Sequence, residues 1–176
     1  MYRRILSAVI LCTVLLQAGA AGTDRNRDKS DDGFTTIVFD RAHSPVPYRI
    51  PAIAETRQGT LLAACDFRFS HTDVGWNNRN GRWQINVVMK RSEDHGRTWS
   101  DTLCVARGDE QAEDTVHTAF GDPCIVADRT SDNVLMSCVA GKTGYQTATR
   151  RNPMHAFFFR STDGGRTWDN GCLLYT

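Results

Sequence analysis

The feature that most constrains the fold is an eight-residue phrase that occurs twice, at residues 92–99 and 161–168. Both copies read S-x-D-x-G-R-T-W, and they start 69 residues apart. That lag is too long for a helical solenoid repeat, but it suits a four-stranded sheet repeated around an axis. The duplication therefore predicts an all-β protein built from repeated sheets.

The phrase has the chemistry of a rigid turn. Asp94 and Asp163 can accept hydrogen bonds from backbone amides a few residues further on, and Gly96 and Gly165 can adopt positive φ. The tryptophan that ends each copy can fold back as an apolar plug. We therefore assign these aspartates a structural role in a hairpin and not a catalytic one.

When the two phrases are aligned, the β-rich runs around them fall at corresponding positions. The expected strands are residues 51–54, 60–65, 85–89 and 103–106 in the first set, and 123–126, 133–139, 155–159 and 172–175 in the second. Each set predicts one four-stranded antiparallel blade of a β-propeller. The loops at 66–84 and 141–154 are long, as expected where binding residues lie, and residues 34–39 predict an extra strand.

Two blades cannot close a ring, because a propeller needs at least four. We therefore expect residues 34–176 to be the first two blades of a larger propeller, or a truncated product. Residues 1–21 have the basic start, apolar run and small residues of a secretory signal peptide, and 22–33 predict a disordered tether. The protein is expected to be secreted, periplasmic or on the cell surface, with lipid attachment at Cys12 left open.

Charge and composition narrow the function classes. Without Arg3 and Arg4 the net charge changes from +1 to −1, so neither nucleic acid nor an anionic membrane is an expected partner. No apolar run is long enough to span a bilayer. The histidines lack ligand spacing, and we expect no metal and no cofactor. The cysteines that follow the signal peptide are interpreted as small buried hydrophobes, with one disulfide left open: Cys65, Cys104, Cys124, Cys138 and Cys172.

Tyr48-Arg49-Ile50-Pro51 stands just before the first blade. Together with the two turn phrases, it resembles the secreted bacterial exo-α-sialidases, six-bladed propellers that remove terminal sialic acid from glycans. The resemblance implies that Arg49 is one of three arginines that clamp the sialic acid carboxylate. A guanidinium fork suits that role, because it matches a carboxylate bidentately and stays charged at every working pH.

The resemblance assigns three more residues. Arg68 ends the second expected strand, and Asp73 follows at the spacing of the family's general acid/base, with Asp66 as the competing candidate. Asp122 of Gly121-Asp122-Pro123 is implied to hold the sugar's O4 and amide edge together with Arg68, unless it only caps a turn. We expect these side chains on one face of the blades and the turn-phrase aspartates at the opposite rim.

The implied activity is retaining hydrolysis of terminal α-linked sialic acids on glycoproteins, glycolipids and oligosaccharides. The family's nucleophilic tyrosine, its glutamate and two further clamp arginines come from later blades, so we expect this chain alone to be inactive. A non-catalytic Asp-box propeller, a sialic acid lectin and a non-functional truncated product remain as alternatives. Linkage preference and the balance of hydrolysis and transfer are not encoded in these motifs.

Overall fold

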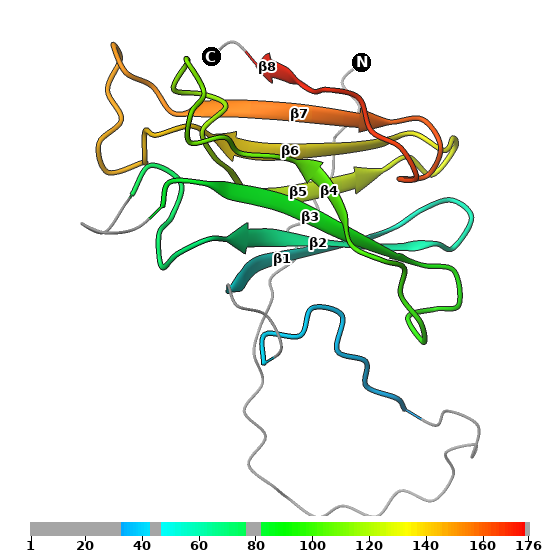
Figure 1. Ribbon diagram of the computed structural model, residues 1–176. Helices are drawn as coiled ribbons and strands as arrows, with labels where there is room; N and C mark the ends of the chain where they lie inside the picture. The colour runs from blue at the N-terminus through cyan, green and yellow to red at the C-terminus, as the bar shows by residue number, and fades with distance from the viewer. Residues whose placement is uncertain (1–32, 43–46, 77–81, 175–176) are drawn as a thin grey trace, which may run out of the picture. The chain divides into compact units, whose positions relative to one another are not determined.

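The computed structural model describes residues 33–42, 47–76 and 82–174. The described residues form eight strands and no helix, arranged as two four-stranded antiparallel sheets in sequential order. The first sheet contains β1 (Tyr48–Glu55), β2 (Leu61–Arg68), β3 (Ile85–Ser92) and β4 (Leu103–Ala106); the second contains β5 (Phe120–Ala127), β6 (Val134–Ala140), β7 (His155–Ser161) and β8 (Cys172–Leu174). Figure 1 shows the two sheets stacked face to face. The expected pair of four-stranded blades is confirmed.

Some expected segments differ from the structure. The extra strand expected at residues 34–39 is not formed. Phe39 packs by its side chain on the first sheet, with its ring centroid 5.2 Å from that of Tyr48 and 5.7 Å from the Lys90 ammonium. Strand β2 continues through Asp66 to Arg68, so Asp66 belongs to the sheet and not to the loop.

The expected signal peptide (1–21) and residues 22–32 of the expected tether lie outside the described residues. Among the residues described, none forms a helix with the length and apolar character needed to cross a membrane.

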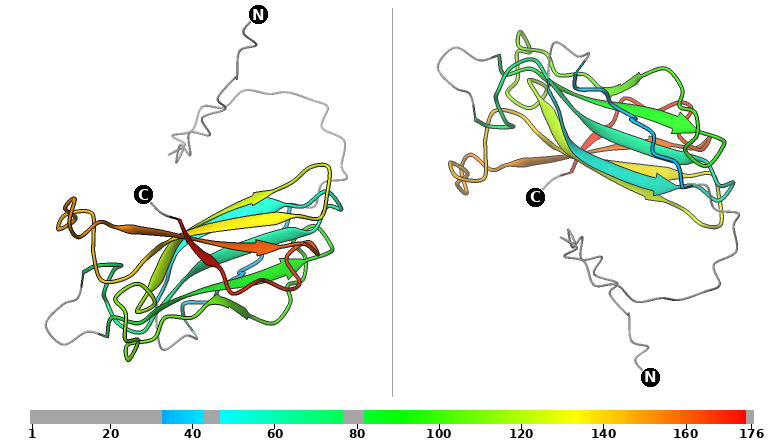
Figure 2. Two further views of the ribbon diagram at one scale, coloured as in Figure 1. Left: turned by 90° about the horizontal axis from the view of Figure 1, so that it is seen from above. Right: turned by 90° about the horizontal axis from the view of Figure 1, so that it is seen from below.

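The core lies between the two sheets. Strand β5 contacts β1, β2 and β3, which places the second sheet over one face of the first, as the two views of Figure 2 also show. Leu62 and Met89 of the first sheet are fully buried against Met136, Phe157 and Phe159 of the second. Full burial of such a side chain contributes about 1.5–3 kcal/mol, so the two sheets stabilise each other.

Strands β1 and β5 carry matching irregularities where they begin. The pairing register shifts between Arg49 and Ala52 in β1 and between Gly121 and Cys124 in β5. The residue before proline has positive φ in both, 52° at Ile50 and 54° at Asp122. A non-glycine residue in this region costs about 1–3 kcal/mol and persists only where the surroundings hold it. These β-bulges bend both strands at the edge where the expected site residues lie.

The two turn phrases fold as expected. In each, the aspartate accepts hydrogen bonds from the amide and hydroxyl of the threonine four residues later, at 2.6–3.1 Å. Gly96 and Gly165 have φ of 87° and 81°, and both donate their amide to the serine that opens the phrase. Trp168 packs against the core. The hairpins between β3 and β4 and between β7 and β8 are therefore closed by local hydrogen bonds.

The cysteines differ in part from expectation. All five described cysteines are free thiols. Cys65 and Cys138 are buried as expected, whereas Cys124 and Cys172 are exposed. They are exposed because Cys124, Ser137, Phe158 and Cys172 are successive cross-strand partners, which places their side chains on the outer face of the second sheet.

Candidate active site

One edge of the two sheets gathers the residues expected to form the site. Strands β1 and β2 are antiparallel, so Arg49 near the start of β1 lies opposite Asp66 near the end of β2. Arg68 ends β2, and Asp73 follows in the β2–β3 loop. The structure brings Arg68, Asp73 and Asp122 together. The turn phrases follow the far ends of β3 and β7, so the expected separation of the two groups is observed.

Arg68 is at the centre of this group. Its side chain is 1% exposed and its guanidinium forms an ion pair of 2.8 Å with Asp73 and one of 4.0 Å with Asp122. Its Nε and one terminal nitrogen donate to Asp66 at 2.9 and 2.6 Å, and the other terminal nitrogen donates to the carbonyl of Thr72 at 2.8 Å. One buried guanidinium thus faces three carboxylates and fixes the start of the β2–β3 loop.

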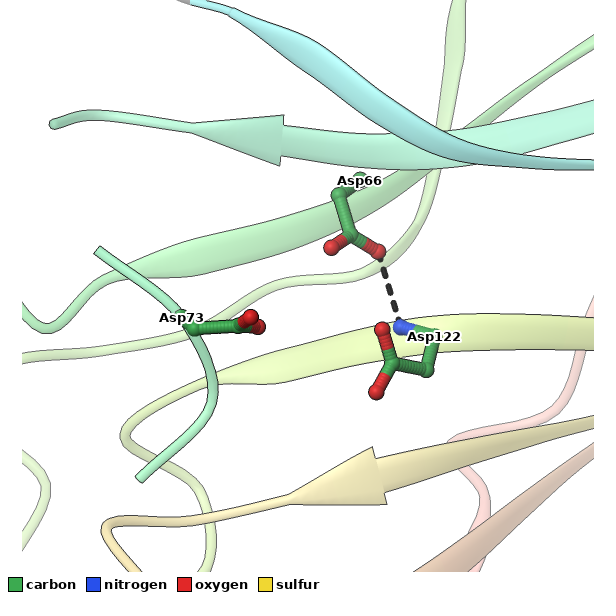
Figure 3. A group of neighbouring side chains, drawn as sticks. All are labelled: Asp66, Asp73 and Asp122. Atoms are coloured by element: carbon green, nitrogen blue, oxygen red, sulfur yellow. Dashed lines mark hydrogen bonds between the residues drawn. The ribbon is translucent and has the colours of Figure 1, made fainter. Parts of the chain in front are cut away.

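Asp66 has no exposed surface. Besides the two hydrogen bonds from Arg68, it accepts one of 2.8 Å from the backbone amide of Asp122, which Figure 3 shows. Burial raises the pKa of Asp66 to about 6, although Arg68 and the Asp122 amide act to lower it. The local pairing expected for Asp66 is present. Its contact with the second sheet was not expected.

Asp122 and Asp73 are the accessible carboxylates of the group, with 45% and 47% of their side chains exposed. Burial and the charge of Asp73 raise the pKa of Asp122, while Arg68 and Arg49 act to lower it. A carboxyl group that shares a cation with neighbouring carboxylates can hold a proton nearer neutral pH than an isolated one. The group therefore presents two accessible carboxyl groups, Asp73 and Asp122, beside one buried cation.

Arg49 differs from Arg68 in its environment. Its side chain is exposed, and within the described residues no carboxylate lies in ion-pair contact with it. It borders a small hollow of about 210 Å³ together with Phe39 and Tyr48. As far as the described residues go, the guanidinium of Arg49 can therefore bind an anionic group of a ligand.

A larger pocket opens beside Asp73 and Asp122. It has a volume of about 380 Å³ and is lined also by Trp76, Tyr145 and Met154. The β2–β3 and β6–β7 loops meet at its wall, where a Cβ on Gly75 would lie 1.8 Å from the backbone nitrogen of Gly144. Only glycine allows the two loops to come this close, so the pocket depends on that contact. The sequence motifs alone do not reveal this pocket, because its walls come from both blades.

The three carboxylates also have the spacing of a cation site. One oxygen each from Asp66, Asp73 and Asp122 lie within 4.8 Å of one another. The guanidinium of Arg68 contacts all three, so a protein cation already balances their charge. The expectation that the protein uses no metal stays a prediction.

Comparison with known proteins shows which proteins this chain is related to. No protein-family model matches the chain. A sialidase of Micromonospora viridifaciens is 33% identical over 130 residues, which are 70% of this chain and 18% of that protein. A sialidase of Clostridium perfringens is 27% identical over 153 residues, 84% of this chain and 37% of that protein. The matched part of the chain is related to the bacterial sialidases.

Solved sialidase structures show the same fold. The Hadza microbial sialidase Hz136 superposes with a TM-score of 0.55 at 24% identity, covering 75% of this chain and 26% of that structure. The NanB sialidase of Streptococcus pneumoniae superposes with a TM-score of 0.58 at 14% identity, covering 80% and 38%. The expected resemblance and the partial β-propeller are confirmed. The chain spans 18–37% of the length of the curated sialidases it matches.

Proposed function

We propose that this chain is part of a secreted exo-α-sialidase that removes terminal α-linked sialic acids from glycoconjugates with retention of configuration. The observation that supports the proposal is that Asp73 and Asp122 contact buried Arg68, and that Arg49 lies opposite Asp66 at the same edge, in a chain related to sialidases. Sialic acid carries a carboxylate, and an exposed arginine is suited to bind it. Secretion rests on the signal-peptide pattern of residues 1–21.

The proposed chemistry gives each residue a role. Arg49 binds the substrate carboxylate as one member of a clamp. Asp73 protonates the glycosidic oxygen of the leaving group, and Asp122 with Arg68 holds the polar edge of the sugar. The tyrosine nucleophile, its glutamate and two clamp arginines that the sialidase resemblance implies have no assigned counterpart here. We therefore expect no turnover by this chain alone.

A chimera tests the proposal. Residues 34–174 would replace the matched segment of the Micromonospora viridifaciens sialidase, whose remaining part would supply the later blades. We expect the folded chimera to hydrolyse a fluorogenic aryl sialoside, and Arg49→Ala to lower kcat/KM roughly 10- to 100-fold, as expected for loss of hydrogen bonds to a charged group. A folded chimera that binds sialic acid without turnover would support the lectin alternative, and one that does neither would contradict the proposal.

A further inference from the structure

Asp66 is a buried carboxylate that connects the two sheets. It lies in β2 of the first sheet, and one oxygen accepts both hydrogen bonds from Arg68. Its other oxygen accepts the backbone amide of Asp122 in β5 of the second sheet, 56 residues away in the sequence. Figure 3 shows Asp66 pointing toward Asp122 across the space between the sheets. Asp66 therefore contacts both a site side chain and the backbone of a site residue.

The repeat shows that a blade does not need a carboxylate at this place. Val87 pairs with Asp66 in the first sheet, and Ala156 pairs with Val139 in the second. Val87 and Ala156 are 69 residues apart, like the two turn phrases, so Asp66 and Val139 occupy equivalent positions. Val139 is an ordinary apolar side chain, whereas a buried charge opposes folding unless it is paired. The stability of the blade therefore does not explain why residue 66 is an aspartate.

We propose that Asp66 is a positioning residue whose ionised carboxylate holds the Arg68 guanidinium and the Asp122 backbone in the geometry that the site needs. The effect of this positioning on substrate binding rests on the proposed function. Without this acceptor, Arg68 keeps only Asp73, Asp122 and the Thr72 carbonyl as described partners. Its guanidinium then shifts toward the two accessible carboxylates, which alters the groups that meet the sugar.

Asp122 depends on the same contact. Its φ of 54° lies in the left-handed region that non-glycine residues avoid. The hydrogen bond from its amide to Asp66 is a restraint that comes from the other sheet. Gly121 fits beside it only because it lacks a side chain, since a Cβ there would lie 2.7 Å from Val74 and 3.2 Å from an Asp66 oxygen. Loss of the Asp66 acceptor therefore removes the hydrogen bond by which the first sheet restrains the backbone of Asp122.

The charge of Asp66 depends on pH. Its pKa of about 6 means that it is ionised at pH 7 and largely protonated at pH 5. The charged and titratable groups around it are Arg49 from β1, Cys65 and Arg68 from β2, Asp73 from the loop, Asp122 from β5 and Cys138 from β6. Lowering the pH below about 6 should therefore weaken the contact between the Asp66 carboxyl and the Arg68 guanidinium, because Asp66 loses its charge while Arg68 keeps its own.

The test uses the full chain and the nitrogen-15 NMR signal of the Arg68 Nε–H group, identified by its loss in Arg68→Lys. We expect this signal to shift with a midpoint near pH 6 in the unaltered protein. Asp66→Asn should remove the pH midpoint of the Arg68 signal and raise the hydrogen-exchange rate of the Arg68 Nε–H group at least 10-fold. Asp66→Glu should restore a pH midpoint of that signal. Asp132→Asn is the matched control, because Asp132 also joins the sheets, through Arg57 and Gln58, away from the site.

The folded chimera described above is titrated with N-acetylneuraminate, with and without Asp66→Asn. We expect its affinity to fall at least 5-fold between pH 7 and pH 5 in the unaltered chimera and to be low at both pH values in Asp66→Asn. An Arg68 signal without a midpoint near pH 6, or one unchanged in folded Asp66→Asn, overturns the positioning role even if the sugar binds. A pH-dependent Arg68 signal together with a folded chimera that does not bind the sugar supports the positioning role and contradicts the proposed function.

Discussion

At the scale of single residues, two carboxylates in contact with one arginine differ in what they can do. Asp66 is fully buried and accepts three hydrogen bonds, so it has no access to a substrate. Asp73 is 47% exposed and borders the larger pocket. A general acid must reach the leaving-group oxygen, and accessibility therefore favours Asp73 over Asp66.

A substrate series tests the role of Asp73. In the chimera, Asp73→Ala should lower turnover of a sialyllactose roughly 10²- to 10⁴-fold, because an alkoxide leaving group needs a proton. An aryl sialoside should lose much less, since its phenolate departs unaided. Rates of both substrates, measured for Asp73→Ala and for the exposed control Asp101→Ala, give the comparison. Equal losses on the two substrates would show that Asp73 is not the acid.

At the scale of elements, the two turn phrases are self-contained. The Thr98 hydroxyl and amide lower the pKa of Asp94 to about 2. Burial opposes the shift at Asp163, but the Thr167 hydroxyl and amide likewise lower its pKa to about 2. Both carboxylates are therefore more acidic in the folded chain than in the unfolded one, and folding favours their ionised form.

This shift sets the pH range in which the turns stabilise the fold. A carboxylate with a depressed folded pKa stabilises the protein above its ordinary pKa near 4, and this contribution is lost as the pH falls toward 2. We expect Asp163→Ala to lower the melting temperature by roughly 3–6 °C at pH 7, the effect of losing about 1 kcal/mol of turn hydrogen bonding. Melting curves between pH 2 and pH 7 test this, and a difference as large at pH 2 as at pH 7 would contradict it.

At the scale of the whole molecule, the second sheet has an open apolar face. Leu62 pairs with Arg91 and Leu135 with Arg160, and these arginines are 69 residues apart, so Leu135 repeats Leu62. Leu62 is fully buried by the second sheet, whereas Leu135 is 42% exposed and nearby Val126 is 61% exposed. The same face is therefore covered in one blade and open in the other.

We expect residues 22–176 to self-associate through this open face in solution, because large exposed apolar patches favour association. Leu135→Asp should shift the chain toward monomer, whereas Ile37→Asp, at a 73% exposed position in the segment before β1, should leave the distribution unchanged. Sedimentation velocity over a 100-fold concentration range provides the measurement. A monomer at every concentration would show that the open face does not bind a second copy.

The sequence by itself determined the features that depend on neighbouring residues. The repeated phrase predicted both hairpins, because each aspartate binds an amide only four residues away. Its repeat length predicted the two blades, and strand order placed Arg49, Arg68, Asp73 and Asp122 away from the turns. The proposed catalytic and binding roles of these four residues stay predictions.

Only the tertiary structure decided the features that arise where the two blades meet. The hydrogen bond from Asp122 to Asp66 joins residues 56 positions apart, and the pocket depends on the approach of Gly75 to Gly144. The bulges at Ile50 and Asp122 and the irregular path of residues 34–39 were likewise absent from the strand pattern. A local pattern encodes hydrogen bonds within a turn, whereas contacts between blades depend on how two separately formed sheets pack.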